Sequence, residues 1–257
     1  MIVPAYNEEG RILETLEDYR KTLIGRYGDA IRIVVASDST DGTNRIVSGY
    51  ARRHRQVSLY IKKERQGKGA ALLRGFQLAC QDPDTTIVGF ADADPSISGS
   101  EMVKMLECLN RKGVDGAIAS RYVKGSRWIG RPRPSRLVAS RCYNLMVRAL
   151  FGFPYKDTQC GAKFFRKGAL CSALGSIMLT DMSFDINLLY EMRKRKLNVV
   201  ETPITYRWVN EGSTLRLKRQ VPQMFMVALG YKIVRSPLKD VVPDRLKGFV
   251  YNLLKRW

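Results

Sequence analysis

The chain has very few of the residues on which several common kinds of enzyme depend. It contains a single histidine, His54, so neither a Ser-His-Asp nor a Cys-His catalytic arrangement can be assembled. Its five cysteines are scattered, and none forms a C-x-x-C pair. This pattern argues against a zinc site and for free thiols in a reducing compartment. Any general base would be a carboxylate, a lysine or the substrate itself.

Acidic residues and long apolar runs are also scarce. The 257 residues include 44 Lys and Arg against 24 Asp and Glu, a net charge of +20. Such a charge calls for an anionic partner: nucleic acid, an anionic membrane or a phosphorylated substrate. No run of about 18 apolar residues occurs, so no segment is expected to span a bilayer. The chain opens on Met1-Ile2-Val3-Pro4, which reads as the end of a strand and leaves open a shortened first strand or an upstream anchor.

The hydrophobic pattern predicts an α/β fold with a mostly parallel sheet flanked by helices. Strands are expected at 31–36, 57–61, 87–91 and 116–119, and helices at 10–23, 43–53, 68–81 and 98–112. Ligands of such sheets bind at the carboxyl ends of the strands. The polar loops at 5–8, 38–43 and 92–94 should therefore share one edge.

Two carboxylates, Asp92 and Asp94, follow a predicted buried strand and are spaced one residue apart. Alternate strand residues point the same way, so the two side chains can converge and would repel each other without a cation between them. A hard divalent ion, Mg²⁺ or Mn²⁺, shared with substrate phosphates fits this arrangement. The alternative is a strand followed by an Asp-capped helix at Pro95 and Ser96.

A glycine-rich turn, Gly67-Lys68-Gly69-Ala70-Ala71, offers a second candidate site. It is not a Walker A loop, because no Ser or Thr follows Lys68, and it lacks the third small residue of a dinucleotide fingerprint. Backbone N–H groups at a helix start together with a lysine still suit an anion. A solvated turn is the alternative.

Beyond residue 120 the chain becomes strongly basic. From Arg121 to Arg148 there are eight Arg or Lys and no acidic residue, and a helix is expected at 135–151. Two amphipathic segments follow, at 220–235 and 244–257, of a kind that can lie in a membrane interface or pack on the core. We therefore expect a catalytic domain at 1–215 and a basic membrane-interface segment at 216–257.

Seven motifs, in order, resemble the inverting nucleotide-sugar glycosyltransferases of family 2, which have the GT-A fold. Four lie in the first half of the chain: Val3-Pro4-Ala5-Tyr6-Asn7-Glu8-Glu9, Ser39-Thr40-Asp41-Gly42-Thr43, the Gly67 turn and Asp92-Ala93-Asp94. Three more are similar to the dolichyl-phosphate glucose and mannose synthases: Ser120-Arg121-Tyr122, Asp157-Thr158-Gln159-Cys160-Gly161 and Phe184-Asp185.

The resemblance implies a role for each motif. The residues that would contact the nucleotide sugar are Pro4, Ala5, Tyr6, Glu8, Asp38, Lys68, Asp92 and Ala93. Asp92 and Asp94 would hold the divalent ion, and Arg121 and Arg136 would bind the acceptor phosphate, which a guanidinium group matches bidentately. Asp157 is the first candidate for positioning the acceptor or taking a proton, and Asp185 is the second. Family members usually carry paired aspartates where this chain has Ala36 and Ser37, which leaves the donor nucleotide open.

These features predict metal-dependent, inverting transfer of glucose or mannose from a UDP- or GDP-sugar to a polyprenyl (dolichyl) phosphate. The second pKa of a phosphate monoester is about 6, so the nucleophile is largely ionised and needs no strong base. The enzyme would be peripheral, at the cytoplasmic face of an anionic membrane. Alternatives are a polysaccharide or protein acceptor, or a basic nucleic-acid-binding protein. Nucleic acid is not the predicted partner, because no aromatic-rich RNA-binding motif is visible and the acidic loops would repel phosphates.

Overall fold

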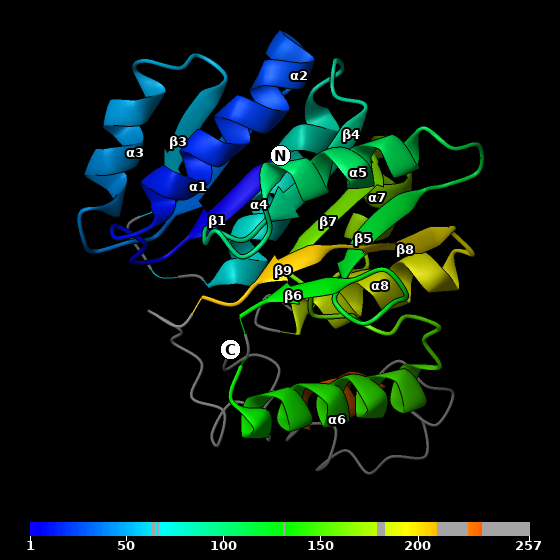
Figure 1. Ribbon diagram of the computed structural model, residues 1–257. Helices are drawn as coiled ribbons and strands as arrows, with labels where there is room; N and C mark the ends of the chain where they lie inside the picture. The colour runs from blue at the N-terminus through cyan, green and yellow to red at the C-terminus, as the bar shows by residue number, and fades with distance from the viewer. Residues whose placement is uncertain (63–64, 66, 131, 179–182, 210–225, 233–257) are drawn as a thin grey trace.

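A central sheet of seven strands organises the computed structural model, which describes residues 1–62, 65, 67–130, 132–178, 183–209 and 226–232 (Figure 1). Its strands are β1 (Ile2–Ala5), β2 (Ile33–Ser37), β3 (Val57–Ile61), β4 (Ile87–Ala91), β5 (Gly116–Ser120), β7 (Ala162–Arg166) and β8 (Val199–Pro203). They lie in the order β3-β2-β1-β4-β7-β5-β8. β7 runs antiparallel to β4 and β5, and the other pairings are parallel.

The predicted mostly parallel sheet is confirmed, and its expected strands occur within one or two residues of their predicted bounds. Their apolar runs are explained by burial on both faces: every residue of β5 is buried. The reversal at β7 was not predicted. It matters for the site, because it brings residues that precede β7 to the same edge as residues that follow β4.

Two helical layers cover the sheet and bury separate apolar clusters (Figure 1). One layer holds α1 (Ile12–Tyr19), a π-helical turn (Arg20–Ile24), α3 (Thr43–Ala51) and α5 (Gly99–Leu109), with the short turns α2 (Gly25–Tyr27) and η2 (Gly28–Ala30) after the π-helical turn. The other holds α4 (Lys68–Gln81), α7 (Lys167–Leu174) and α8 (Phe184–Lys194). The four helices predicted before residue 120 are all present.

Helix α6 (Pro134–Phe151) lies at the end of the molecule, beside a two-stranded parallel sheet of β6 (Arg127–Ile129) and β9 (Thr205–Arg207) (Figure 1). Pro134 stands at its first turn and Gly152 ends it with φ 66°, a left-handed conformation that glycine adopts without strain. Its inner face, including Tyr143 and Val147, joins the second apolar cluster. Among the described residues, no helix is long and apolar enough to cross a bilayer.

Part of the predicted interface segment packs against the core. Residues 226–232 are helical, and Val227, Ala228 and Tyr231 are buried in the second apolar cluster. The Tyr231 hydroxyl accepts a hydrogen bond from Asn187 at 2.7 Å and donates one to Glu191 at 3.1 Å. The rest of 216–257, including 244–257, lies outside the described residues, so the domain division stays a prediction.

A disulfide bond joins Cys80 to Cys171, which corrects the expectation that all five cysteines are free thiols. Cys80 lies near the end of α4 and Cys171 lies in α7, and these helices pack on the same face of the sheet. Residues 91 positions apart thereby have Cα atoms 5.9 Å from each other. The packing of α4 against α7 brings the two cysteines together, which their spacing in the sequence does not reveal. Because a disulfide is present, cysteine usage gives no support to a reducing compartment.

Candidate active site

The loops that follow β1 and β2 interlock at the carboxyl edge of the sheet, as the parallel topology predicts. Asn7 adopts φ 55°, and its N–H donates to Ser39 Oγ at 3.0 Å. Its side-chain oxygen accepts the N–H of Thr40 at 3.0 Å. Pro4 and Ala5 form the end of β1 directly before this loop. The first two predicted donor motifs are thus brought together.

Tyr6 and Asp38 border the glycine-rich turn. The guanidinium carbon of Arg65 lies 4.2 Å from the centre of the Tyr6 ring. Asp38 accepts the backbone N–H of Gly67 at 3.2 Å. Beside them, a small pocket is lined by Ala36, Ser37, Asp38, Tyr60, Lys62, Ala71 and Arg74.

Glu8 is held near the aspartate pair rather than beside the pocket. Its carboxylate forms an ion pair with Arg11, with Oε1 2.9 Å from Nη2, and its N–H donates to Thr43 Oγ1 at 2.8 Å. Burial raises the pKa of Glu8 against the opposing effect of Arg11, and the charges of Asp94 and Asp92 add to the rise. The negative charges of Asp92 and Asp94 therefore oppose ionisation of the Glu8 carboxyl group.

Lys68 places a cation on the Asp92 carboxylate. Its Nζ lies 2.5 Å from Asp92 Oδ1, and the Asp92 side chain is 39% exposed. Burial would lower the pKa of Lys68, but Asp92 and then Asp185 outweigh it and raise that pKa. Asp94 accepts the N–H of Ser96 at 3.0 Å, and its pKa is raised by burial and then by Asp92. The two predicted ligands are therefore close enough to repel each other.

Backbone contacts fix the position of Asp92. Its N–H donates to the carbonyl oxygen of Gly161 at 2.9 Å, and its own carbonyl oxygen accepts the Tyr19 hydroxyl at 3.2 Å. The carboxylate occupies the space beside Gly161, where a Cβ atom would overlap it. Ala93 is buried, and its carbonyl oxygen accepts the Thr15 hydroxyl at 3.0 Å.

The donor set of Asp92 and Asp94 fits a divalent ion shared with a substrate. The described residues contain no cluster of three or more His, Cys, Asp or Glu side chains that could hold a metal alone. Mg²⁺ and similar ions commonly take one or two carboxylates from a protein and complete their coordination with phosphate oxygens and water. Burial and then the charge of Asp92 raise the pKa of Asp94, and a divalent ion between the two carboxylates would relieve this repulsion.

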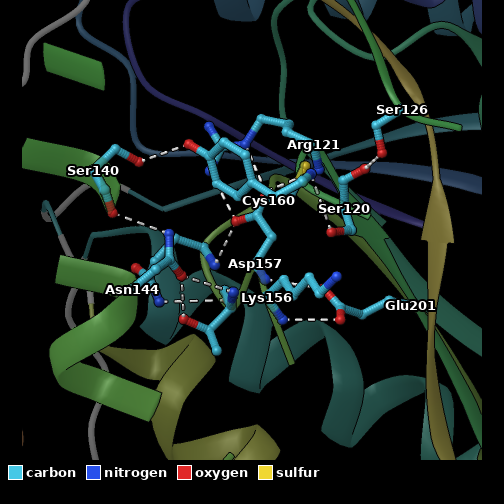
Figure 2. Close-up of polar contacts among 12 residues, drawn as sticks. Ser120, Arg121, Ser126, Ser140, Asn144, Lys156, Asp157, Cys160 and Glu201 are labelled. Atoms are coloured by element: carbon cyan, nitrogen blue, oxygen red, sulfur yellow. Dashed lines mark hydrogen bonds and ion pairs between the residues drawn. The ribbon is translucent and has the colours of Figure 1, made fainter. Parts of the chain in front are cut away.

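Arg121 and Asp157 form a buried, bidentate ion pair (Figure 2). Nε and Nη2 of Arg121 donate to Oδ2 and Oδ1 of Asp157 at 2.7 and 2.9 Å, and the Arg121 N–H donates to Oδ2 at 3.1 Å. The Asp157 side chain is fully buried, and Glu201 on β8 accepts the N–H groups of Lys156 and Asp157. Both oxygens of Asp157 are therefore committed to Arg121.

Aromatic rings surround the predicted phosphate-binding arginines. The Arg121 guanidinium carbon lies 5.3 Å from the ring centres of Tyr122 and Tyr206 and 6.0 Å from that of Trp128. Arg136, at the start of α6, lies 4.6 Å from the ring centre of Trp208. These rings come from β9, β6 and the segments next to them, so the small sheet serves as a platform for guanidinium groups.

Sequence reasoning missed two cations and the aromatic platform. Arg141 on α6 lies 4.4 Å from the ring centre of Tyr122, so a third arginine joins the predicted pair. Lys163 on β7 is fully buried and lies 2.6 Å from Asp185, the second base candidate. The role of Arg141 could have been suspected from the sequence, because it lies on the same predicted basic helix as Arg136. For Lys163 no signal existed, because a lysine within an apolar strand can equally face solvent.

Comparisons with known proteins agree with this geometry. Residues 1–172 match the family described as Glycosyl transferase family 2. The chain is 30% identical over 249 residues to a glycosyltransferase named AglD from Haloferax volcanii. The aligned region covers 96% of this chain but only 38% of that protein. It is 28% identical to the dolichyl-phosphate β-glucosyltransferase ALG5C of Trichomonas vaginalis, over 96% of this chain and 76% of that protein.

Solved structures share the fold at low sequence identity. Glucosyl-3-phosphoglycerate synthase from Mycobacterium tuberculosis, crystallised with Mn²⁺, UDP and phosphoglyceric acid, superposes with a TM-score of 0.63 at 19% identity, over 90% of this chain and 76% of that one. The mannosyltransferase PcManGT from Pyrobaculum calidifontis, in complex with GDP-Man and Mn²⁺, superposes with a TM-score of 0.59 at 19% identity, over 97% of this chain and 67% of that one. The family match spans more than half of the chain, and the protein therefore belongs to glycosyl transferase family 2, with a GT-A-type fold.

Proposed function

We propose that this protein transfers a hexose, glucose or mannose, from a UDP- or GDP-sugar to a polyprenyl phosphate of the dolichyl type. The observation that supports this most strongly is the pairing of two half-sites. The acidic edge of the sheet, with Lys68, suits a nucleoside diphosphate and its metal ion. The arginines beside aromatic rings suit a phosphate that carries an apolar tail. Relatives named dolichyl-phosphate β-glucosyltransferases favour the same acceptor.

On the donor side, Asp92 and Asp94 would hold a divalent ion, which when bound would stabilise the departing diphosphate as a Lewis acid. Lys68 lies beside Asp92 and would add a further positive charge near the departing diphosphate. The pocket next to Asp38 would receive the base, with Tyr6 and Arg65 at its approach. Neutralising the leaving group in this way assists rupture of the glycosidic bond to the diphosphate.

On the acceptor side, Arg121 would bind the phosphate with the donors that Asp157 leaves available, and Arg136 and Arg141 would add charge. The phosphate oxygen attacks the anomeric carbon with inversion and is already largely ionised near neutral pH. The contacts of Asp157 support the positioning role over the base role, since its oxygens are buried and engaged. Asp185 is likewise engaged, by Lys163.

The outer face of α6 would meet the membrane that carries the acceptor. Val138 and Leu145 are 60% and 65% exposed, and with Cys142 and Ala149 they form a stripe at helical spacing. Basic residues flank this stripe, and the sequence from Arg121 to Arg148 contains no acidic residue. An apolar stripe among cations is the composition of a helix that lies in an anionic interface. This composition supports a position at a membrane surface, for which we propose the cytoplasmic face.

A substrate panel tests the proposal. The purified protein would be offered UDP- and GDP-hexoses with a short-chain polyprenyl phosphate, with Mn²⁺ or with EDTA. Separate arms would replace the lipid with 3-phosphoglycerate, an oligosaccharide or a peptide. We expect product only in the arm that contains a sugar donor, the polyprenyl phosphate and a divalent ion. Transfer to a water-soluble acceptor with no use of the lipid would refute the acceptor assignment, and turnover in EDTA would refute the metal assignment.

A further inference from the structure

Four charged side chains of alternating sign run from the donor site into the protein interior. Asp92 is 39% exposed and contacts Lys68, which is 25% exposed. Asp185, at the first turn of α8, is 8% exposed and contacts Lys163, whose side chain has no exposed surface. The two pairs lie close together, because the ammonium groups of Lys68 and Lys163 approach the same buried ring. Two acids and two lysines balance, so the interior carries no net charge from this row.

Both lysines lie beside the same aromatic ring. Their Nζ atoms are 5.2 and 5.3 Å from the centre of the buried Phe90 ring, for Lys68 and Lys163 respectively. Lys163 is paired with Phe90 across the antiparallel β4–β7 register, and Lys68 reaches the ring from the start of α4. Four secondary structure elements, β4, β7, α4 and α8, therefore converge on this row of charges, whose inner pair extends it beyond the donor site.

Lys163 also binds the backbone next to Gly161, the residue that accepts the Asp92 N–H. Its Nζ donates to the carbonyl oxygen of Cys160 at 2.9 Å. The next residue, Gly161, accepts the Asp92 N–H and leaves room for the Asp92 carboxylate. The Lys163 ammonium group thus contacts both the Asp185 carboxylate and the carbonyl oxygen of Cys160. Cys160 directly precedes Gly161, which accepts the Asp92 N–H.

We propose that Lys163 is a positioning residue of the donor site, an inference that rests on the proposed function. It keeps Asp185 in place, so that Lys68 remains beside Asp92, and it fixes the bend at Cys160 and Gly161. Without its charge, Asp185 would be left buried with an uncompensated charge and would draw Lys68 away from Asp92, because opposite charges in a poorly solvated region attract strongly. Lys163 itself contacts no substrate in this arrangement.

Nucleotide binding by calorimetry, with UDP and GDP as probes in the presence of Mn²⁺, tests this role. Lys163→Met should weaken binding of the preferred nucleotide by about tenfold or more, about 1.4 kcal/mol, and Lys163→Arg should recover part of the loss. Lys163→Met combined with Asp185→Leu removes both buried charges and should restore the melting temperature, since apolar residues can replace a buried ion pair without loss of stability. Nucleotide affinity should recover only in part in that double variant, because Asp185 no longer draws Lys68 away but the Cys160 carbonyl still lacks its donor.

The matched control is Arg195→Met, which removes a cation from the Glu191 ion pair at the far end of α8. It should lower the melting temperature and leave nucleotide affinity at the wild-type value. Full recovery of affinity in the double variant together with the melting temperature would reduce Lys163 to a structural role and overturn the inference. Wild-type affinity in Lys163→Met would also overturn it while leaving the proposed function intact. Failure of the wild-type protein to bind either nucleotide would instead overturn the proposed function, and the inference with it.

Discussion

The carboxylate of Asp92 rests against Gly161, in the space that a side chain at position 161 would fill. The contact joins two motifs that are far apart in the sequence, because Asp92 follows β4 and Gly161 precedes the antiparallel β7. Four residues before Gly161, Asp157 holds Arg121. A single short segment therefore supports the proposed metal ligand Asp92 at one end and the proposed phosphate-binding Arg121 at the other.

Gly161→Ala should impair donor binding more than it impairs stability. The new methyl group would displace the Asp92 carboxylate, and we expect nucleotide affinity in Mn²⁺ to fall at least about tenfold, as for other changes that disturb the support of a metal ligand. Calorimetry with UDP and GDP gives the affinity and a melting curve gives the stability. Gly168→Ala is the matched control, because no described residue has an atom within 4 Å of a Cβ at that position. Equal affinities for the two variants would show that the close contact has no role in the site.

Asp92→Asn and Asp94→Asn should each lower turnover at least about 100-fold while the fold is kept, because each removes a proposed ligand and not only its support. A radiolabelled hexose-transfer assay over a Mn²⁺ series gives the turnover. Asp84→Asn, in an exposed turn, is the control. Near-normal turnover of either variant in metal-free buffer would show that this pair does not serve a metal.

The same pair predicts a pH-dependent stability. The pKa of Asp94 is raised in the folded state by burial and then by Asp92. The folded protein therefore binds more protons than the unfolded chain, and this group's contribution to stability falls as pH rises above about 4, its ordinary pKa. In EDTA, Asp94→Asn should melt at a higher temperature than the wild type at pH 7, and the difference should shrink toward pH 4. Mn²⁺ should raise the melting temperature of the wild type alone. A lower melting temperature for the variant at pH 7 would contradict the repulsion.

Asp157→Asn distinguishes a positioning carboxylate from a base. Loss of the charge leaves Arg121 buried without its partner, which should cost about 3–5 kcal/mol of stability and raise the KM for polyprenyl phosphate. Positioning predicts an unchanged shape of the pH–rate profile, measured beside a melting curve. If Asp157 were the base, turnover at saturating acceptor would collapse and one limb of that profile would be lost, whatever the change in melting temperature.

Arg141→Gln is the companion variant, since Arg141 is exposed, lies over the Tyr122 ring and forms no ion pair with any other described residue. It should raise the KM for the acceptor several-fold and leave the melting temperature and the nucleotide affinity unchanged. A loss of nucleotide affinity with normal use of the lipid would assign Arg141 to the donor side.

Much of the donor edge could be predicted from the sequence because local rules determine it. Parallel strands put the loops after β1, β2 and β4 at one edge, and the buried run before Asp92 marked the central strand. The acceptor side depends on contacts that no local rule fixes. The bidentate pair of Arg121 and Asp157 spans 36 positions, and the Cys80–Cys171 disulfide spans 91.

Lys163 shows most clearly where sequence reasoning ends. In an apolar strand a lysine is usually placed at a solvated face, because burial of an ammonium group without a partner is costly. Here the partner is Asp185 on another element, and the reversed strand β7 brings the two together. Prediction of the buried pair would have required the topology first, and the reversal of β7 left no mark in the hydrophobic pattern.

The last prediction concerns the outer face of α6, where Cys142 serves as a natural reporter. Among the three free cysteines, Cys108 and Cys160 are buried and Cys142 is exposed. Burial, and then Asp157, raises the pKa of Cys160 to about 12, so that thiol is unreactive near neutral pH. A maleimide should therefore label Cys142, four residues from Val138 and three from Leu145 on the same stripe.

Vesicles that contain anionic lipid should slow this labelling several-fold if the stripe lies in the interface, and neutral vesicles should slow it less. Added salt should restore the rate, because attraction between basic residues and the leaflet is screened. Val138→Glu with Leu145→Glu should abolish both the protection and sedimentation with vesicles while leaving nucleotide affinity unchanged, since the donor residues lie elsewhere. Full sedimentation of the wild type with unchanged labelling of Cys142 would exclude α6 and move the contact to another surface of the protein.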